Sequence, residues 1–140
     1  MPKVNCYLSF NGTCESAFNF YKSVFGGELT LLRYKDMPSE HPIPESEKNK
    51  VLHAYLPISK ETSLIGADTS EAFGHKTTFG DNMAVSVTAD SEEEAKRIFD
   101  ALSKKGKVIM PLEKAFWGAL FGQFTDQFGV LWMVHYQMNK

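Results

Sequence analysis

Two histidines stand at strand positions, where an imidazole can act as an acid, a base or a hydrogen-bond donor near neutral pH. His53 lies in the alternating stretch 51–58, and His135 lies near the end of the sequence. A lone histidine in a strand is more often simply packed and hydrogen-bonded, so both interpretations stay open for each residue. Asp68 ends the stretch 63–68. Its carboxylate could belong to a functional site, or it could simply form the turn that follows the strand.

A second group of candidates comes from strand positions that repeat along the chain. Asn5 and Asn82 stand 77 positions apart at the start of two matching strand patterns, although strands disfavour asparagine. A repeated polar residue of this kind predicts a polar cavity or a bond between two modules. The candidate ligand cavity comprises Asn5, Tyr7, His53, Tyr55, Asp68, Asn82, Ser86, Met133 and His135. If His53, His135 and Asp68 converged, they could hold a metal ion.

Two amphipathic helices and eight strands must position these residues. Apolar side chains at helical spacing predict helices over residues 15–25 and 92–103, with Thr13 as the first N-cap and a turn at Asp90 and Ser91 before the second. Alternating apolar and polar residues predict strands over 4–10, 28–35, 51–58, 63–68, 82–87 and 107–112, followed by a hairpin within 116–136. The order βαβββ thus occurs twice, which predicts an internal repeat.

The final hairpin, residues 116–136, holds both tryptophans. Asp126-Gln127-Phe128-Gly129 predicts its turn, and Asp126 is expected to be structural. Gly122, inside a strand, predicts a bulge or a close approach of another backbone. The aromatic side chains are expected to pack in the core or to stack on a planar ligand.

The predicted fold class is α+β, with two tandem βαβββ modules that form paired, curved mixed sheets around a cavity. One helix covers the outer face of each sheet, and the inner faces carry the polar candidates. Continued alternation places Gly66 and Asp68 on the inner face, with Met133 and His135, while Trp132 faces a helix. We expect a single domain over 1–140, with module 1 at about 1–69, a linker at about 70–80 and module 2 at about 81–140.

Composition excludes several classes of partner. The net charge of −2 gives no basic surface for nucleic acid, and no run approaches the roughly 20 apolar residues of a membrane span. Cys6 and Cys14 lack metal-ligand spacing and are expected to be free thiols in a cytoplasmic protein. Cys14 stands near a helix start, where a thiol pKa can be lowered. The loop 36–49, which contains three prolines, is a candidate lid or dimer arm.

The duplicated βαβββ pattern resembles the vicinal oxygen chelate superfamily of glyoxalase I, extradiol dioxygenases and bleomycin-resistance proteins. It looks most similar to the PhnB-like branch. The stretches that carry the resemblance are 7–10, 17–21, 53–54, 65–68, 116–118 and the D-x-F-G-x-x-W motif within 121–132. Proteins of this branch often bear the label 3-demethylubiquinone-9 3-methyltransferase, but nothing in this sequence resembles an S-adenosylmethionine site.

The resemblance implies four metal-ligand positions, which are Asn5, Gly66 or its neighbour Ala67, Asn82 and Met133 here. Divalent metals in such sites prefer imidazole and carboxylate, so we expect no metal and no other cofactor. The expected function is metal-independent binding of a small molecule. The alternative is a lyase, isomerase or dioxygenase that uses a divalent metal, or His53 as acid or base. Burial of wide apolar sheet faces also predicts a homodimer.

Overall fold

The chain folds into two compact units, Met1–Thr78 and Phe79–Lys140. The computed structural model describes residues 2–36 and 43–138. Unit 1 contains β1 (Cys6–Phe10), α1 (Cys14–Phe25), β2 (Thr30–Arg33), β3 (Val51–Pro57) and β4 (Ser63–Asp68), and short 3-10 turns at Tyr34–Asp36, Glu45–Glu47 and Glu71–Phe73. Unit 2 contains β5 (Val85–Thr88), α2 (Glu92–Ser103), β6 (Lys107–Lys114), β7 (Ala119–Thr125) and β8 (Leu131–Gln137). The order βαβββ occurs in both units, which confirms the predicted repeat.

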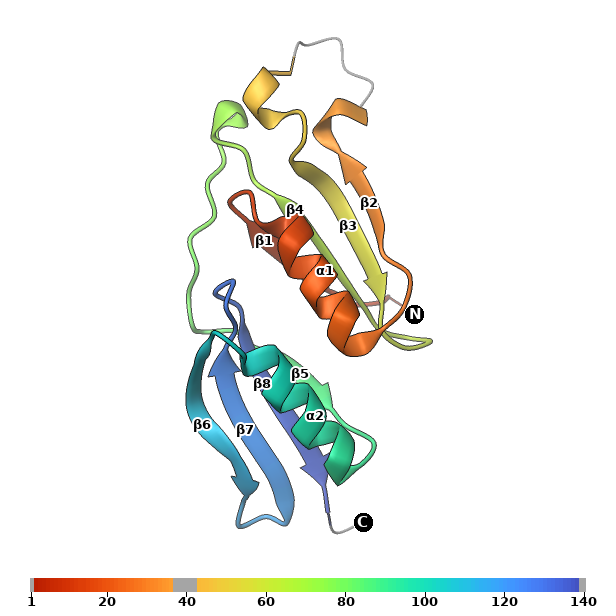
Figure 1. Ribbon diagram of the computed structural model, residues 1–140, viewed down its shortest axis with the longest axis vertical. Coiled ribbons are helices and arrows are strands. Elements are labelled where there is room, and N and C mark those ends of the chain that lie inside the picture. Colours follow the sequence, from red (N-terminus) through yellow and green to blue (C-terminus); the bar gives the residue numbers. More distant parts are fainter. Residues whose placement is uncertain (1, 37–42, 139–140) are drawn as a thin grey trace. The chain divides into compact units, whose positions relative to one another are not determined.

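Each unit has one four-stranded mixed sheet. The strand orders are β1-β4-β3-β2 and β5-β8-β7-β6, and the first and last strand of each repeat pair in parallel. Figure 1 shows one helix lying across one face of each sheet. Neither of the two described helices lies on the opposite face, which we call the open face of that unit. The predicted α+β architecture of two tandem modules is therefore confirmed.

The two helices are anchored in different ways. Each buries an apolar stripe against its own sheet, formed by Ala17, Phe18, Tyr21 and Val24 in α1 and by Ala95, Ile98, Phe99 and Leu102 in α2. Ser91 caps α2, because its hydroxyl accepts a hydrogen bond from the Glu94 amide at 3.1 Å. Thr13 occupies the N-cap position of α1 but makes no side-chain cap bond. Its expected capping role is therefore not realised.

The hairpin of β7 and β8 confirms the structural role predicted for Asp126. Its carboxylate accepts hydrogen bonds from the amides of Phe128 at 2.8 Å and Val130 at 3.0 Å, and from the Trp132 indole at 2.8 Å. Gly129 has a φ of 94°, a conformation that glycine adopts without steric cost. The turn and the indole are thus held by one buried side chain.

Several strands are shorter than the sequence predicts. β1 begins at Cys6, so Asn5 precedes it. β5 begins at Val85, so Asn82 precedes it. β2 covers only Thr30–Arg33, and its register with β3 shifts between Leu32 and Arg33. The Arg33 guanidinium then turns to α1 and donates to both carboxylate oxygens of Glu15, at 3.0 and 2.7 Å.

Within the segment 36–49, residues 37–42 lie outside the described residues. Its role as a lid or dimer arm stays a prediction. The second part of the segment forms the 3-10 turn Glu45–Glu47, in which Glu47 is buried. The predicted surface loop therefore contributes one buried charged side chain, that of Glu47, to unit 1.

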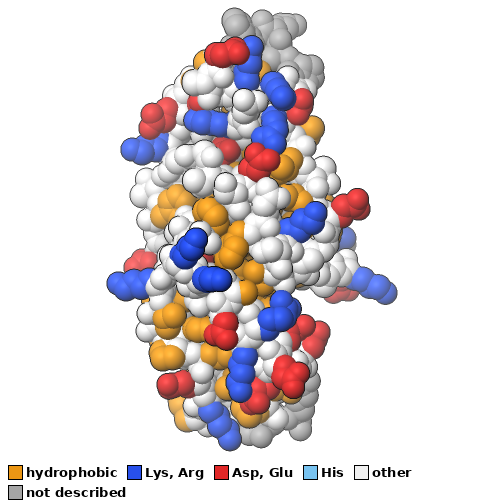
Figure 2. All heavy atoms as spheres, in the orientation of Figure 1, with side chains coloured by type: hydrophobic (Ala, Val, Ile, Leu, Met, Phe, Trp, Pro, Cys, Tyr) orange, Lys and Arg blue, Asp and Glu red, His pale blue; other side chains and the backbone are white. Residues whose placement is uncertain are grey.

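On the helix-bearing side of each unit, Figure 2 shows acidic and basic side chains interspersed, in keeping with the nearly balanced net charge of −2. Neither described helix combines the length and the apolar character that crossing a membrane requires.

Candidate functional site

The open face of unit 1 combines two phenols, an imidazole and aliphatic side chains. Strand pairing sets Tyr7 beside Ile65, and Ile65 beside Tyr55, in one row across the sheet. His53 pairs with Leu32 and shares the face of Tyr55, because alternate residues of a strand point to the same side. Tyr7 is 57% and Tyr55 41% exposed, so both phenol groups are accessible. This face offers aromatic surface with a few polar groups, which suits an organic ligand.

The open face of unit 2 is more mixed. One row contains Ser86, Met133 and Gln123, which are partners across β5, β8 and β7. His135 pairs with Phe121 in the next row. Met133, His135, Phe121 and Gln123 are half-buried, and Ser86 is exposed. The face therefore offers a thioether, a ring and hydrogen-bonding groups.

Gly122 shows which face of β7 and β8 is covered by α2. A Cβ atom on Gly122 would lie 2.5 Å from the Phe99 ring of α2, and Gly122 pairs with Val134. Val134 therefore faces α2 and His135 faces away from it, as predicted. The same Cβ atom would lie 2.9 Å from Leu112 Cα, which confirms the close approach of another backbone that Gly122 predicts.

The sequence analysis placed Gly66 and Asp68 on the inner face of the sheet, away from the helix, and this prediction for β4 is wrong. A Cβ atom on Gly66 would lie 2.7 Å from the Phe18 ring, so Gly66 faces α1. Asp68, two residues later, lies on the same helix-covered side. Ile65 and Ala67 take the open-face positions instead. The sequence does not reveal which of these residues face α1, because residues 64–67 are all apolar or small and show no alternation of polarity.

Asp68 is a structural residue. It is 3% exposed, and its Oδ1 accepts hydrogen bonds from the amides of Gly12 and Cys14, both at 2.9 Å. Its Oδ2 accepts a hydrogen bond from the Val51 amide at 2.9 Å. The carboxylate thus ties the loop before α1 and the first residue of β3 to the end of β4. The expectation that Asp68 lines a ligand cavity is wrong, and it offers no free carboxylate to a metal set with the two histidines.

The four positions that the resemblance assigns to metal ligands do not fit a divalent metal. Asn5 and Asn82 are exposed and precede the strands in which they were expected. Gly66 has no side chain and faces α1, while its neighbour Ala67 carries only a methyl group. Met133 offers a thioether, which hard divalent metals disfavour. Among the described residues, no group of three or more histidine, cysteine, aspartate or glutamate side chains is placed to hold a metal ion.

An exposed aromatic pair adjoins the open face of unit 2. Phe116 is 97% exposed in the turn between β6 and β7, and its ring contacts Trp117 edge to face at 5.0 Å between centroids. The Trp117 ring lies 5.9 Å from that of Phe121. Phe116 is therefore not the core residue that aromatic composition favours. Leu32, Ile65, Phe121 and Gln123 are further open-face residues that sequence reasoning missed, although continued alternation on β2 and β7 could have found three of them.

Cys14 differs from the reactive thiol that its place near a helix start suggests. Burial, and to a lesser extent the charges of Asp68 and Glu15, raise its pKa to about 12. A thiol reacts as its thiolate, so a raised pKa makes Cys14 inert in the folded protein. Cys6, by contrast, is exposed.

This contrast predicts the thiol chemistry of two variants. Near pH 8, Cys14→Ser should react fully with Ellman's reagent through Cys6, while Cys6→Ser should stay unmodified over the same time. Both variants should react in denaturant, which serves as the control for thiol content. Equal native rates for the two variants would contradict the burial of Cys14.

The match to known proteins covers nearly the whole chain. Residues 3–134 match the family model described as the Glyoxalase/Bleomycin resistance protein/Dioxygenase superfamily. Protein YjdN of Escherichia coli K12 is 30% identical over 136 residues, with 92% of this chain and 91% of that protein covered.

Solved structures agree with this match. Protein PA1353 from Pseudomonas aeruginosa is 37% identical, with a TM-score of 0.87, and the comparison covers 99% of this chain and 100% of that one. A PhnB protein from Bacillus cereus is 28% identical, with a TM-score of 0.75 and coverage of 96% and 99%. The similarity therefore includes both units.

Proposed function

We propose that this chain, which belongs to the Glyoxalase/Bleomycin resistance protein/Dioxygenase superfamily, binds a small organic molecule on its open faces without a metal ion. The open face of unit 1 carries the proposal. Tyr7 and Tyr55 supply accessible rings, Ile65 and Leu32 supply aliphatic surface, and His53 supplies an imidazole beside Leu32. Apolar surface with a few polar groups is the usual character of a small-molecule site.

Binding without a metal is supported by the residues at the expected ligand positions. Gly66 and Ala67 offer no donor atom, and the thioether of Met133 suits soft rather than hard cations. An organic ligand can still be oriented by the phenols and imidazoles of the open faces. The binding role can thus persist where the metal role does not.

An enzyme of the superfamily is the second candidate, and His53 is the observation that favours it. Its imidazole lies on the open face that carries the phenol of Tyr55, so a bound molecule would contact a potential acid or base. This candidate would use His53, or a divalent metal recruited in another way, for a lyase, isomerase or dioxygenase reaction.

A homodimer in the cytoplasm completes the proposal. Val108, Ile109 and Met110 on the edge strand β6 are exposed and form apolar surface that a second copy of the chain would cover. Cys6 and Cys14 are both free, which suits a reducing compartment. Sedimentation equilibrium should find wild type as a dimer and Ile109→Lys as a monomer at the same concentration, and a monomeric wild type would contradict the homodimer.

The ligand test compares two histidines of unit 1. A thermal-shift screen of small organic molecules supplies binders, and calorimetry then measures their affinity for wild type, His53→Ala and His75→Ala. His75 is exposed and lies outside the open face, so it is the matched control. Loss of one hydrogen bond to the ligand should weaken binding about tenfold in His53→Ala. The His75→Ala protein should bind as wild type does.

Two measurements separate the candidate functions. Protein purified without chelator should contain less than about one tenth of an equivalent of zinc, nickel, manganese or iron, whereas a metal site filled to one equivalent would contradict metal-free binding. Chromatography of each bound ligand after incubation should recover it unchanged. Turnover that disappears in His53→Ala would establish the enzyme instead.

A further inference from the structure

Unit 1 contains a polar hollow of about 470 Å³ that includes none of the open-face residues. Its lining comes from three places in the sequence: the loop after β1, the turn before β3 and the segment after β4. The side chains that matter are those of Asn11, Glu47, Lys50, Thr69, Glu71 and Lys76. A volume of this size falls within the range of small-molecule sites.

A buried carboxylate forms one wall of the hollow. Glu47 is 5% exposed, and its Oε1 accepts hydrogen bonds from the Ser70 hydroxyl and from Lys50 Nζ, the latter at 3.0 Å. Lys50 Nζ also lies 2.9 Å from Oε2. The bond from Ser70, and then that from Lys50, hold the pKa of Glu47 below its usual value. The ionised carboxylate therefore fixes the Lys50 ammonium at the edge of the hollow.

The opposite wall is held by a side-chain network. Asn11 Oδ1 accepts hydrogen bonds from the Thr77 amide at 2.9 Å and from the Thr69 hydroxyl at 3.2 Å. Asn11 Nδ2 donates to the Thr77 carbonyl at 2.9 Å. These bonds fasten the segment after β4 to the loop after β1. The hollow thus has two walls of defined geometry.

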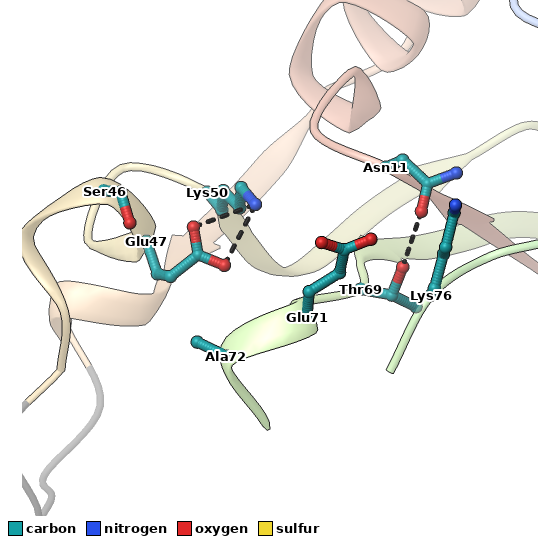
Figure 3. A pocket seen from close by; sticks show the side chains of 8 residues that line it. All are labelled: Asn11, Ser46, Glu47, Lys50, Thr69, Glu71, Ala72 and Lys76. Atoms are coloured by element: carbon teal, nitrogen blue, oxygen red, sulfur yellow. Dashed lines mark hydrogen bonds and ion pairs between the residues drawn. The ribbon is translucent and has the colours of Figure 1, made fainter. Parts of the chain in front are cut away.

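Unused charges face the space between these walls. Glu71 and Lys76 line the hollow, and neither side chain forms an ion pair or hydrogen bond with another described residue. Figure 3 shows the Glu71 carboxylate and the Lys50 and Lys76 side chains around the same space. Within the described part of the chain, Lys50 Nζ bonds to Glu47 alone, so its ammonium, which has three donors, keeps hydrogen-bonding capacity for a ligand. Because Glu47 offsets the charge of Lys50, Glu71 and Lys76 leave one uncompensated charge of each sign among the described residues, and Lys50 adds a hydrogen-bond donor.

We propose that this hollow is a second binding site, which takes a small zwitterion with one anionic group and one primary amine. The anionic group lies against the ammonium groups of Lys50 and Lys76, and the amine lies against Glu71. A simple anion would be repelled by Glu71, and a simple amine would be repelled by Lys76, so each would leave one of these two charges without a partner. An apolar ligand would desolvate charges without replacing their hydrogen bonds.

The test is an NMR titration of the ¹⁵N-labelled full chain with amino acids that differ in charge separation. The probes are 3-aminopropanoate, 4-aminobutanoate and 6-aminohexanoate, and the single-charge controls are butanoate and butylamine. At least one zwitterion should shift the amides of Asn11, Lys50 and Lys76 saturably. Each single-charge control should bind about tenfold more weakly, because it loses one charged hydrogen bond.

Charge-removing variants locate the site. Glu71→Gln and Lys76→Met should each weaken the best zwitterion about five- to tenfold. Lys60→Met and Glu61→Gln remove the same charges from an exposed turn of unit 1 and should leave the affinity unchanged. Butanoate binding as tightly as the zwitterions would overturn the proposal in favour of a simple anion site. Equal affinity in all four variants, or no saturable shift below about 20 mM of any zwitterion, would overturn the site itself.

Discussion

Replacing Asp68 with alanine should lower the free energy of unfolding by about 3–5 kcal/mol, because three backbone amides lose a charged acceptor at once. The amides of Gly12, Cys14 and Val51 have their hydrogen bonds to this carboxylate at 2.9 Å. Because Asp68 is almost fully buried, water cannot easily replace it. Urea unfolding followed by far-ultraviolet circular dichroism measures the loss.

Asparagine at the same position tests the role of charge. Its carbonyl oxygen can keep the two bonds from Gly12 and Cys14, but its amide group would then meet the Val51 amide, donor against donor. Asp68→Asn should therefore fall between wild type and Asp68→Ala, at a loss of about 2 kcal/mol. Hydrogen exchange should speed up most at Val51.

The matched control is Asp100→Ala, since Asp100 is exposed on α2. Exposed substitutions of this kind change stability by less than about 0.5 kcal/mol. If Asp68→Ala were as stable as Asp100→Ala, the three-amide network would not hold unit 1 together. A normal exchange rate at Gly12 and Val51 in Asp68→Ala would contradict it equally.

Alanine at Gly122 should destabilise unit 2 by about 2–3 kcal/mol through overpacking. The new Cβ atom would lie 2.5 Å from the Phe99 ring and 2.9 Å from Leu112 Cα. The ring can move only by disturbing its edge-to-face contact with Phe124, at 5.0 Å between centroids. The backbone at Leu112 has no such freedom. Tryptophan fluorescence during urea unfolding reports this unit, because both tryptophans lie within it.

A double mutant separates the two clashes. Phe99→Leu removes the ring, so Gly122→Ala should cost about 1 kcal/mol less in that background than in wild type. Part of the cost should remain because Leu112 Cα stays in place. Gly80→Ala is the control, since its Cβ would lie 3.8 Å from its nearest neighbour. A Gly122→Ala protein as stable as Gly80→Ala would contradict the close approach of α2 and β7.

Several features follow from the amino-acid sequence alone because they depend on local periodicity. The helix over Glu92–Ser103 and the strand over Ser63–Asp68 have the bounds that were predicted. The direction of Val134 and His135 was also predictable, since a strongly apolar alternation marks the buried side of β8. The double βαβββ order can be predicted because helices and strands differ in the spacing of their apolar residues.

The tertiary structure decided the features that depend on distant partners. The role of Asp68 depends on amides more than 50 residues away in the case of Gly12 and Cys14. The facing of Gly66 depends on the Phe18 ring, because residues 64–67 are too similar in size and polarity to reveal a phase. Glu47 lies in a stretch that composition assigns to solvent, and only its partners Ser70 and Lys50 make its burial possible. The local sequence pattern predicts which apolar residues are buried. Whether a polar residue can be buried depends on hydrogen-bond partners that are distant in the sequence.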